Sequence, residues 1–193
     1  MPSILVFSDL HASEIAIREL KDVIEKVDIS IFCGDILGYG NDIDFSIDFI
    51  KSKVDLAVRG NHDRMCISNE NLDNQAKVVR ESILKTRKKL TNAQREFLSS
   101  LPEEIWYKDM YITHSLNDKY LRTVEDFKLL LSKGKPETKY FFFGHTHERV
   151  FYKVDKKIVL NPGSITKGRN NFSRGYLLIE NNNVNFIDLG DLF

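Results

Sequence analysis

The sequence predicts an α/β fold, in which two mixed β-sheets pack face to face between outer helices as a four-layer αββα sandwich. Its first third alternates short apolar runs with segments of helical spacing, its middle is helical, and its last part is rich in short apolar runs. With 193 residues, 42% of them hydrophobic, the chain is long enough for one domain with a sizeable core. We therefore expect a single domain spanning residues 1–193.

The first third predicts three buried strands joined by helices. Apolar runs at residues 4–7, 29–33 and 54–58 are too short for helices and end at polar turn residues. A helix opens at Ser13-Glu14, and a second covers residues 43–50. Alternating strands and helices imply right-handed crossovers and a largely parallel sheet.

The rest of the chain predicts more helices and a second group of strands. Residues 73–90 form one helix, and the capping-box pattern of residues 91–94 begins another, which ends before Pro102. A further helix is expected around residues 124–132. Strands are expected at residues 111–113, 140–143, 149–154, 158–160, 176–179 and 184–187. The Asn181-Asn182-Asn183 run reads as a hairpin turn between the last two strands.

Charge, cysteine use and hydropathy exclude several classes of protein. The 28 Lys and Arg balance the 28 Asp and Glu, whereas general nucleic-acid binders usually carry a basic surplus or a basic face. The two cysteines, Cys33 and Cys66, are too few for a disulfide framework and fit a reducing cytosol. No stretch approaches the ~20 apolar residues of a membrane span, and the N-terminal run is too short for a secretion signal. We expect a cytoplasmic protein with no membrane segment.

All five histidines fall at or just after the end of a predicted strand, beside Asp, Asn, Gly or Thr. They are His11, His62, His114, His145 and His147. Because ligands of open α/β sheets bind outside the carboxyl ends of the strands, we expect these loops to converge. A lone histidine at a strand end is more often structural than a ligand. A shared placement of all five favours a common site.

With their neighbours, the histidines form a set of metal-ligand types. The candidates are Asp9, His11, Asp35, Asn61, His114, His145 and His147. Imidazole and carboxylate ligands suit first-row divalent metals, and a set without cysteine argues against a structural zinc site. Seven ligands exceed what one ion needs and fit two ions sharing a carboxylate, an arrangement that serves in-line displacement at phosphorus. Alternation in extended chain further predicts that Asp9 and His11 share one face, as do His145 and His147.

At these residues the sequence resembles the calcineurin-like metallophosphoesterase family. The family's ordered blocks are Asp-x-His, Gly-Asp, Gly-Asn-His-Asp, a lone His and Gly-His-x-His. Here they occupy residues 9–11, 34–35, 60–63, 114 and 144–147. The turn at residues 161–164 and the stretch 34–40 are most similar to the small prokaryotic phosphodiesterase and phosphatase branch, which lacks a cap domain.

The resemblance implies a role for each residue of the blocks. Its first metal is held by Asp9, His11 and His147, its second by Asn61, His114 and His145, and Asp35 bridges both. A bridging hydroxide attacks phosphorus in line, while His62 contacts the phosphate and protonates the leaving oxygen. The cofactors implied are two divalent ions, Mn foremost, with Fe, Ni, Zn or Co as alternatives.

The sequence departs from the family in ways that bear on His62. Protein Ser/Thr phosphatases of the superfamily pair this histidine with an aspartate three residues after the bridging one, and here that position is Gly38. This argues against a protein phosphatase and leaves Asp63 and Asp42 as candidates to orient His62. Ser115 replaces a glycine that often follows the lone histidine, with little effect on ligation expected.

Four basic side chains are candidates for substrate contacts. Arg59 and Arg64 flank the Gly-Asn-His-Asp block, while Lys167 and Arg169 follow the 161–164 turn. Each is suited to a phosphate oxygen or an anionic group, and each also fits an ordinary solvated surface. Tyr39 fits either stacking on a nucleobase or simple packing.

Two classes of function remain open. The first is a dinuclear metal-dependent phosphoesterase acting on small phosphodiesters, including nucleotides, and also on phosphomonoesters. The second is a non-catalytic metal-binding scaffold that resembles the retromer subunit, although a scaffold need not keep all seven ligands and His62. Neutral charge gives no strong case for long nucleic acid. The apolar tail at residues 187–193 leaves open whether it packs on the body or on a neighbouring chain in an oligomer.

Overall fold

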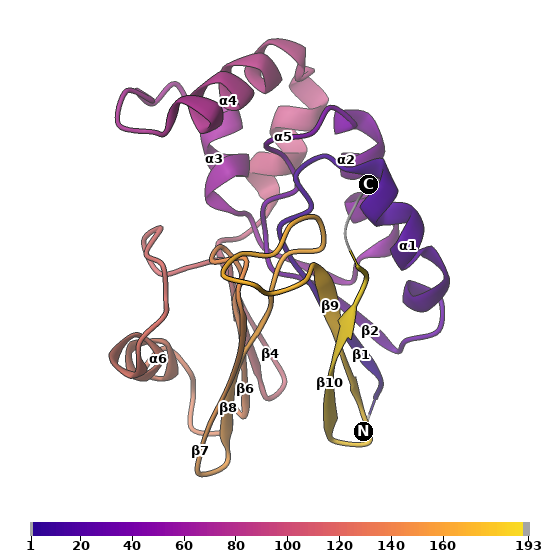
Figure 1. The fold of residues 1–193 in the computed structure, drawn as a ribbon, viewed down its shortest axis with the longest axis vertical. Coiled ribbons are helices and arrows are strands. Elements are labelled where there is room, and N and C mark those ends of the chain that lie inside the picture. The colour runs from indigo at the N-terminus through magenta and orange to yellow at the C-terminus, as the bar shows by residue number, and fades with distance from the viewer. Residues whose placement is uncertain (1, 191–193) are drawn as a thin grey trace.

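The computed structural model describes residues 2–190 and contains two five-stranded mixed sheets that face one another (Figure 1). The strand order is β10-β9-β1-β2-β3 in the first sheet and β4-β5-β6-β8-β7 in the second. Parallel pairing joins β1, β2 and β3, and also β5, β6 and β8, while the other pairings are antiparallel. The strands are β1 (Ile4–Phe7), β2 (Ile29–Phe32), β3 (Leu56–Ala57), β4 (Glu104–Tyr107), β5 (Met110–Thr113), β6 (Tyr140–Phe142), β7 (Arg149–Val154), β8 (Lys157–Pro162), β9 (Gly175–Glu180) and β10 (Asn183–Asp188).

Helices flank both sheets and rise above one end of the sandwich. Figure 1 shows α1 beside the first sheet, α6 beside the second, and α3, α4 and α5 together at the end where the site loops lie. The helices are α1 (Glu14–Ile24), α2 (Ile43–Lys53), α3 (Asn61–Ile67), α4 (Lys77–Lys89), α5 (Asn92–Ser100) and α6 (Val124–Leu131). None of the described helices is long and apolar enough to cross a membrane.

Three apolar clusters define the four layers. Alternate residues of a strand face opposite sides of a sheet, so Ile4 and Val6 pack between the sheets while Leu5 and Phe7 pack against the helices of the first sheet. On the outer side of the second sheet, Phe127 of α6 packs in a third cluster with strand residues. The αββα sandwich of two mixed sheets is therefore confirmed.

Most predicted elements are confirmed, and their local chemistry accounts for them. The Thr91 hydroxyl accepts a hydrogen bond from the Gln94 N–H, which is the predicted capping box at the start of α5. Asn181 and Asn182 have φ of 52° and 65°, which is the left-handed conformation that asparagine tolerates in a hairpin turn. The end of the tail, residues 191–193, lies outside the described residues.

Three predicted boundaries are wrong. The strand expected at residues 54–58 is only Leu56–Ala57, and the helix expected from residue 73 begins at Lys77. The block at residues 60–63, read as a loop, instead opens the helix α3. Gly60 is its N-cap, and the Asp63 carboxylate accepts a hydrogen bond from the Gly60 N–H. A glycine N-cap offers no side-chain signal, so the pattern looked like a turn.

Candidate metal centre

The loops that carry the seven candidate ligands meet at one end of the sandwich. They follow β1, β2, β3, β5 and β6, and all seven side chains are buried except that of Asn61, which is partly buried. The structure groups the ligand atoms into overlapping clusters, in each of which the atoms lie within 4.8 Å of one another. The clusters are Asp9, His11 and His147; His11, Asp35 and His62; and Asp35, His114 and His145.

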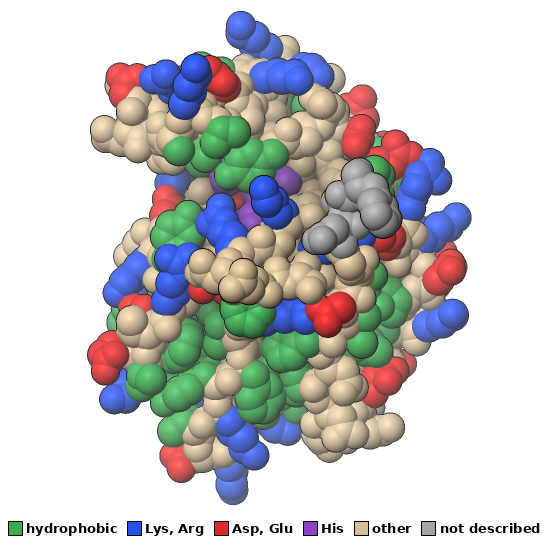
Figure 2. Space-filling model, viewed as in Figure 1, with side chains coloured by type: hydrophobic (Ala, Val, Ile, Leu, Met, Phe, Trp, Pro, Cys, Tyr) green, Lys and Arg blue, Asp and Glu red, His purple; other side chains and the backbone are tan. Residues whose placement is uncertain are grey.

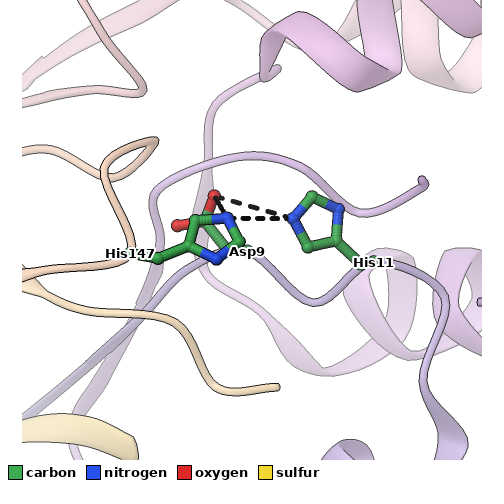
Figure 3. Close-up of side chains that lie close together, drawn as sticks. All are labelled: Asp9, His11 and His147. Atoms are coloured by element: carbon green, nitrogen blue, oxygen red, sulfur yellow. Dashed lines mark hydrogen bonds and ion pairs between the residues drawn. The ribbon is translucent and has the colours of Figure 1, made fainter. Parts of the chain in front are cut away.

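The first cluster consists of Asp9, His11 and His147, whose ligand atoms point toward one another (Figure 3). His11 Nδ1 donates to the Leu37 carbonyl at 3.0 Å and His147 Nδ1 to the Lys167 carbonyl at 2.9 Å. These bonds leave the two Nε2 atoms facing each other at 3.2 Å.

A third electron-rich atom completes the first cluster. Asp9 Oδ1 lies 3.2 Å from His147 Nε2, and this buried oxygen has no hydrogen-bond partner among the described residues. Unshared electron pairs buried this close repel one another unless a proton or a metal cation lies among them. The donor set therefore fits a divalent cation.

The second cluster consists of Asp35, His114 and His145, with Asn61 beside it. His114 Nδ1 donates to the Cys33 carbonyl at 2.6 Å, so its Nε2 faces Asn61 Oδ1 at 3.0 Å and Asp35 Oδ2 at 3.4 Å. His145 uses the opposite nitrogen, because its Nε2 donates to the Asp118 carbonyl at 3.0 Å and leaves Nδ1 for the cluster. In both clusters a backbone carbonyl thus fixes which nitrogen is available as a ligand.

Asp35 lies where the two clusters meet. It belongs to the cluster with His114 and also to the one with His11 and His62. Its Oδ1 accepts the His62 N–H at 2.9 Å. A Cβ at position 60 would lie 2.1 Å from Asp35 Oδ1, so only glycine there allows this close approach.

The ligand loops are not extended. Asp9, His11, Asp35, His145 and His147 all have φ between 50° and 68°, in the left-handed region that non-glycine residues rarely adopt. The prediction that His145 and His147 share one face is therefore wrong. Asp9 and His11 do share a cluster, but His147 joins the first cluster and His145 the second. Strained backbone of this kind is concentrated at functional sites.

His62 belongs to the cluster with His11 and Asp35, and none of the described residues forms a hydrogen bond with its buried Nδ1. A Cβ at position 38 would lie 2.9 Å from this atom, and Gly38 has φ of 145°, so an aspartate there would be strained. Both candidates for orienting His62 bond elsewhere, since Asp42 accepts the Glu14 N–H and Asp63 accepts backbone N–H groups.

The Asp63 carboxylate holds the loop that carries Asp35. It accepts the N–H groups of Asp35, Ile36 and Leu37 at 2.9–3.1 Å, together with that of Gly60. Burial and the charge of Asp35 raise the pKa of Asp63 to about 7 against these four bonds. Asp63 therefore positions a ligand without being one.

Burial and proximity separate the pKa values of the ligands. Burial opposes ionisation of Asp9, but the adjacent His147 outweighs it and lowers the pKa of Asp9 to about 2. Burial, aided by neighbouring His62, lowers the pKa of His11 to about 3, and burial with neighbouring His114 lowers that of His145 to about 4. Burial also disfavours protonated His114, yet the Asp35 carboxylate raises its pKa to about 10.

The four basic candidates line two cavities, and Arg169 also lines a third, central cavity. Arg59 and Arg64 line a cavity of about 280 Å³ that reaches Asn61 and His114. They are ion-paired with Glu103 at 3.1 Å and Asp118 at 2.5 Å respectively. Lys167 and Arg169 line another cavity, of about 530 Å³, that reaches His11 and His147. Figure 2 shows histidine side chains at the bottom of a hollow with Lys and Arg side chains at its rim.

Three residues at the centre were not predicted from the sequence. Asp118 holds His145 through its carbonyl, Tyr120 stacks on the His145 ring at 4.3 Å, and Val78 of α4 lines a central cavity of about 330 Å³. The turn-forming residues around Asn117-Asp118 were the available signal for the loop. No feature of the sequence indicated that a side chain of α4 lies at the centre. Tyr39, which the sequence offered for stacking or packing, has its ring centroid 4.7 Å from that of His11 and 5.1 Å from that of His62.

The chain is similar to known proteins in both sequence and structure. Residues 3–183 match the model of the calcineurin-like phosphoesterase superfamily domain. The uncharacterized protein MJ0912 of Methanocaldococcus jannaschii is 30% identical over 193 residues, which cover 89% of this chain and 79% of the relative. Phosphodiesterase MJ0936 of the same organism is 30% identical over 69 residues, covering 30% of this chain and 42% of that protein. A metallophosphoesterase from Sphaerobacter thermophilus has the same fold, with a TM-score of 0.78 at 23% identity, over 92% of this chain and 83% of the other.

Proposed function

The chain belongs to the calcineurin-like phosphoesterase superfamily, and from this premise we propose that residues 1–193 form one phosphodiesterase domain that works with two divalent metal ions. Membership supports a metal-dependent hydrolase of phosphoester bonds. The number of ions, their identity as Mn²⁺ and the preference for diesters are the parts that we propose.

The pairing of two ligand clusters around Asp35 is the observation that carries the proposal. Asp9, His11 and His147 would hold one ion, and His114, His145 and Asn61 the other, with Asp35 shared. Ions bound there would supply positive charge that attracts the phosphate, and they would lower the pKa of a bound water. Each histidine ligand is fixed by a carbonyl, so the chain holds the donor atoms in place before any ion binds.

His62 is the proposed acid. Its backbone N–H is bonded to Asp35, which places the ring beside both clusters. No described residue bonds its Nδ1, and the ring lines the central cavity with Asp35, Asn61 and His147. His62 Nδ1 is therefore free to bond a phosphate oxygen. Burial lowers the pKa of His62, so the negative charge of a bound phosphate would have to favour the protonated ring before it gives a proton to the leaving oxygen.

The preference for diesters rests on space on both sides of the centre. The cavity with Arg59 and Arg64 reaches the ligands Asn61 and His114, and the cavity with Lys167 and Arg169 reaches His11 and His147. A phosphate held between the clusters would thus have room for a substituent on each side. A relative that matches part of the chain is named a phosphodiesterase, which agrees with this assignment.

The test is hydrolysis of bis-p-nitrophenyl phosphate by metal-stripped protein reloaded with Mn²⁺, with p-nitrophenyl phosphate as the monoester comparison. We expect metal-dependent turnover that is faster with the diester. His62→Ala should lower it by about 10²–10⁴-fold, the usual contribution of a general acid, without changing the metal content. Two bound ions per chain without turnover of either ester would contradict the proposal and favour the metal-binding scaffold.

A further inference from the structure

The cavity beside the first cluster, here called the basic cavity, is lined by two cations. Its lining includes the ligands His11 and His147, the side chains of Tyr39 and Val78, and the cations Lys167 and Arg169. No carboxylate among residues 2–190 lines it. At about 530 Å³ it is larger than a phosphate group alone requires.

The two cations of the basic cavity have no anionic partner among residues 2–190. The Arg169 guanidinium donates only to the Tyr120 hydroxyl, at 3.4 Å, and lies over that ring at 5.9 Å from its centroid. No hydrogen bond or ion pair of the Lys167 ammonium occurs within that range. Each of the other nine arginines has a carboxylate or a backbone carbonyl as partner. Uncompensated positive charge beside a cavity favours an anionic ligand.

The basic cavity also has an exposed apolar part in its lining, formed by Tyr39 and Val78. Tyr39 is 40% exposed although its ring packs on His11 and His62, and Val78 is 61% exposed. A tyrosine ring and a valine side chain add nothing to the binding of phosphate itself, but they fit the faces of a planar ring.

We propose that the basic cavity binds the arm of a diester substrate that carries both a planar base and a second phosphate. In this arrangement Tyr39 and Val78 contact the base, and Lys167 and Arg169 bind the second phosphate. The ligand class is therefore a nucleotide with a phosphate beyond the reacting one. The inference rests on the proposed function, because it assumes that the reacting phosphate lies at the clusters.

In the cavity on the other side of the clusters, both arginines are neutralised by carboxylates. Arg59 and Arg64 lie there with Glu103 and Asp118, which are their ion-pair partners and also line that cavity. An anionic group entering it would have to displace a carboxylate. The second phosphate is thus assigned to the basic cavity only.

Binding calorimetry on the Mn²⁺-loaded protein tests the assignment with three ligands: inorganic phosphate, thymidine 5′-monophosphate and thymidine 3′,5′-bisphosphate. Affinity should rise about tenfold with the base and about tenfold again with the second phosphate, as expected for stacking and for a charged hydrogen bond. Tyr39→Ser should remove the first step while Tyr39→Phe keeps it. Arg169→Met should remove the second step, whereas Lys88→Met, which changes an exposed lysine of α4 outside both cavities, should leave both steps intact.

The outcomes separate this inference from the proposed function. Equal affinity for the two thymidine nucleotides, or equal effects of Arg169→Met and Lys88→Met, would overturn the assignment. Turnover of bis-p-nitrophenyl phosphate is measured on the same preparations. If the protein turns over the diester but shows neither affinity step, the nucleotide arm is rejected and the phosphodiesterase activity stands. If both affinity steps occur without turnover, the ligand class stands and the catalytic proposal is rejected. A protein that binds none of the three ligands contradicts the inference.

Discussion

The two ligand clusters are built alike, but His11 of the first cluster and His114 of the second differ in protonation. In the first cluster, the pKa of Asp9 is about 2 and that of His11 is about 3, so at neutral pH the carboxylate is ionised and the imidazole is neutral. In the second cluster, Asp35 raises the pKa of His114 to about 10, so this imidazole is protonated in the metal-free protein. Burial, aided by neighbouring His62, thus keeps the imidazole of His11 neutral, whereas the adjacent Asp35 carboxylate outweighs burial at His114.

This difference has a consequence for metal binding. A metal ligand must be deprotonated, so an ion entering the second cluster has to displace the proton of His114. Binding of the second ion should therefore release a proton and strengthen as pH rises, while His11 adds no such dependence above pH 4. We expect the two ions to differ in the pH dependence of their affinity.

The largest expected effect comes from the carboxylate that the clusters share. Asp35→Asn should lower diester turnover by at least about 10³-fold, because both ions lose charge stabilisation worth several kcal/mol. Asp9→Asn should affect the first ion only. Metal content by mass spectrometry alongside turnover checks this, and equal loss of both ions in the two variants would show that Asp35 is not specifically shared.

A second substitution tests how the loop of Asp35 is held. Asp63→Ala leaves four buried N–H groups without their acceptor and should lower the free energy of unfolding by about 3 kcal/mol or more. Asp42→Ala is the matched control, since it removes one exposed bond to the Glu14 N–H and should cost about 1 kcal/mol or less. Urea unfolding of both variants measures the difference. A similar loss of unfolding free energy in the two variants would show that Asp63 does not hold the loop of Asp35.

The pH dependence of stability provides a smaller effect with a definite sign. The pKa of His114 rises from 6.5 in the unfolded chain to about 10 in the folded metal-free protein, so between these values the folded state holds the extra proton. The stabilisation is complete below pH 6.5 and is lost as pH rises toward 10.

Urea unfolding at pH 7.0 and 8.5 tests this directly. The proton of His114 should contribute a loss of about 1.4 kcal/mol per pH unit, the value for one linked proton, and Asp63, with a pKa of about 7, should add a smaller loss near pH 7. The Mn²⁺-loaded protein should show a weaker dependence, because the ion has already displaced the proton. Metal-free protein that is equally stable at both pH values would contradict the charge assigned to His114.

The smallest effect compares the aromatic neighbours of the clusters. Tyr120 stacks on His145 and Tyr39 packs edge-on against His11. Tyr120→Leu should weaken the second ion by about 2–12-fold, the range for one aromatic pair, and Tyr39→Leu should do the same to the first. Competition with a fluorescent chelator measures both affinities. If Tyr120→Leu weakened the first ion, or Tyr39→Leu the second, the assignment of each tyrosine to its cluster would be refuted.

The sequence allowed much of the centre to be predicted because its signals are local. Histidines at the ends of apolar runs implied convergence at one edge, and the structure brings His11, His114 and His147 together there. The partition of His145 and His147 could not be derived from alternation, because positive φ at both residues turns their side chains apart. The paths of α4 and of the loop carrying Tyr120 depend on tertiary packing, which periodicity does not describe.

The central claim is that both clusters must be filled for turnover. Mn²⁺ titrated into metal-stripped protein, with bis-p-nitrophenyl phosphate hydrolysis followed at each addition, tests it most directly. We expect a rate that curves upward through the first equivalent and levels off at two, because only molecules with both clusters filled turn over. A rate that is already maximal at one equivalent, or no turnover with two ions bound, would contradict it.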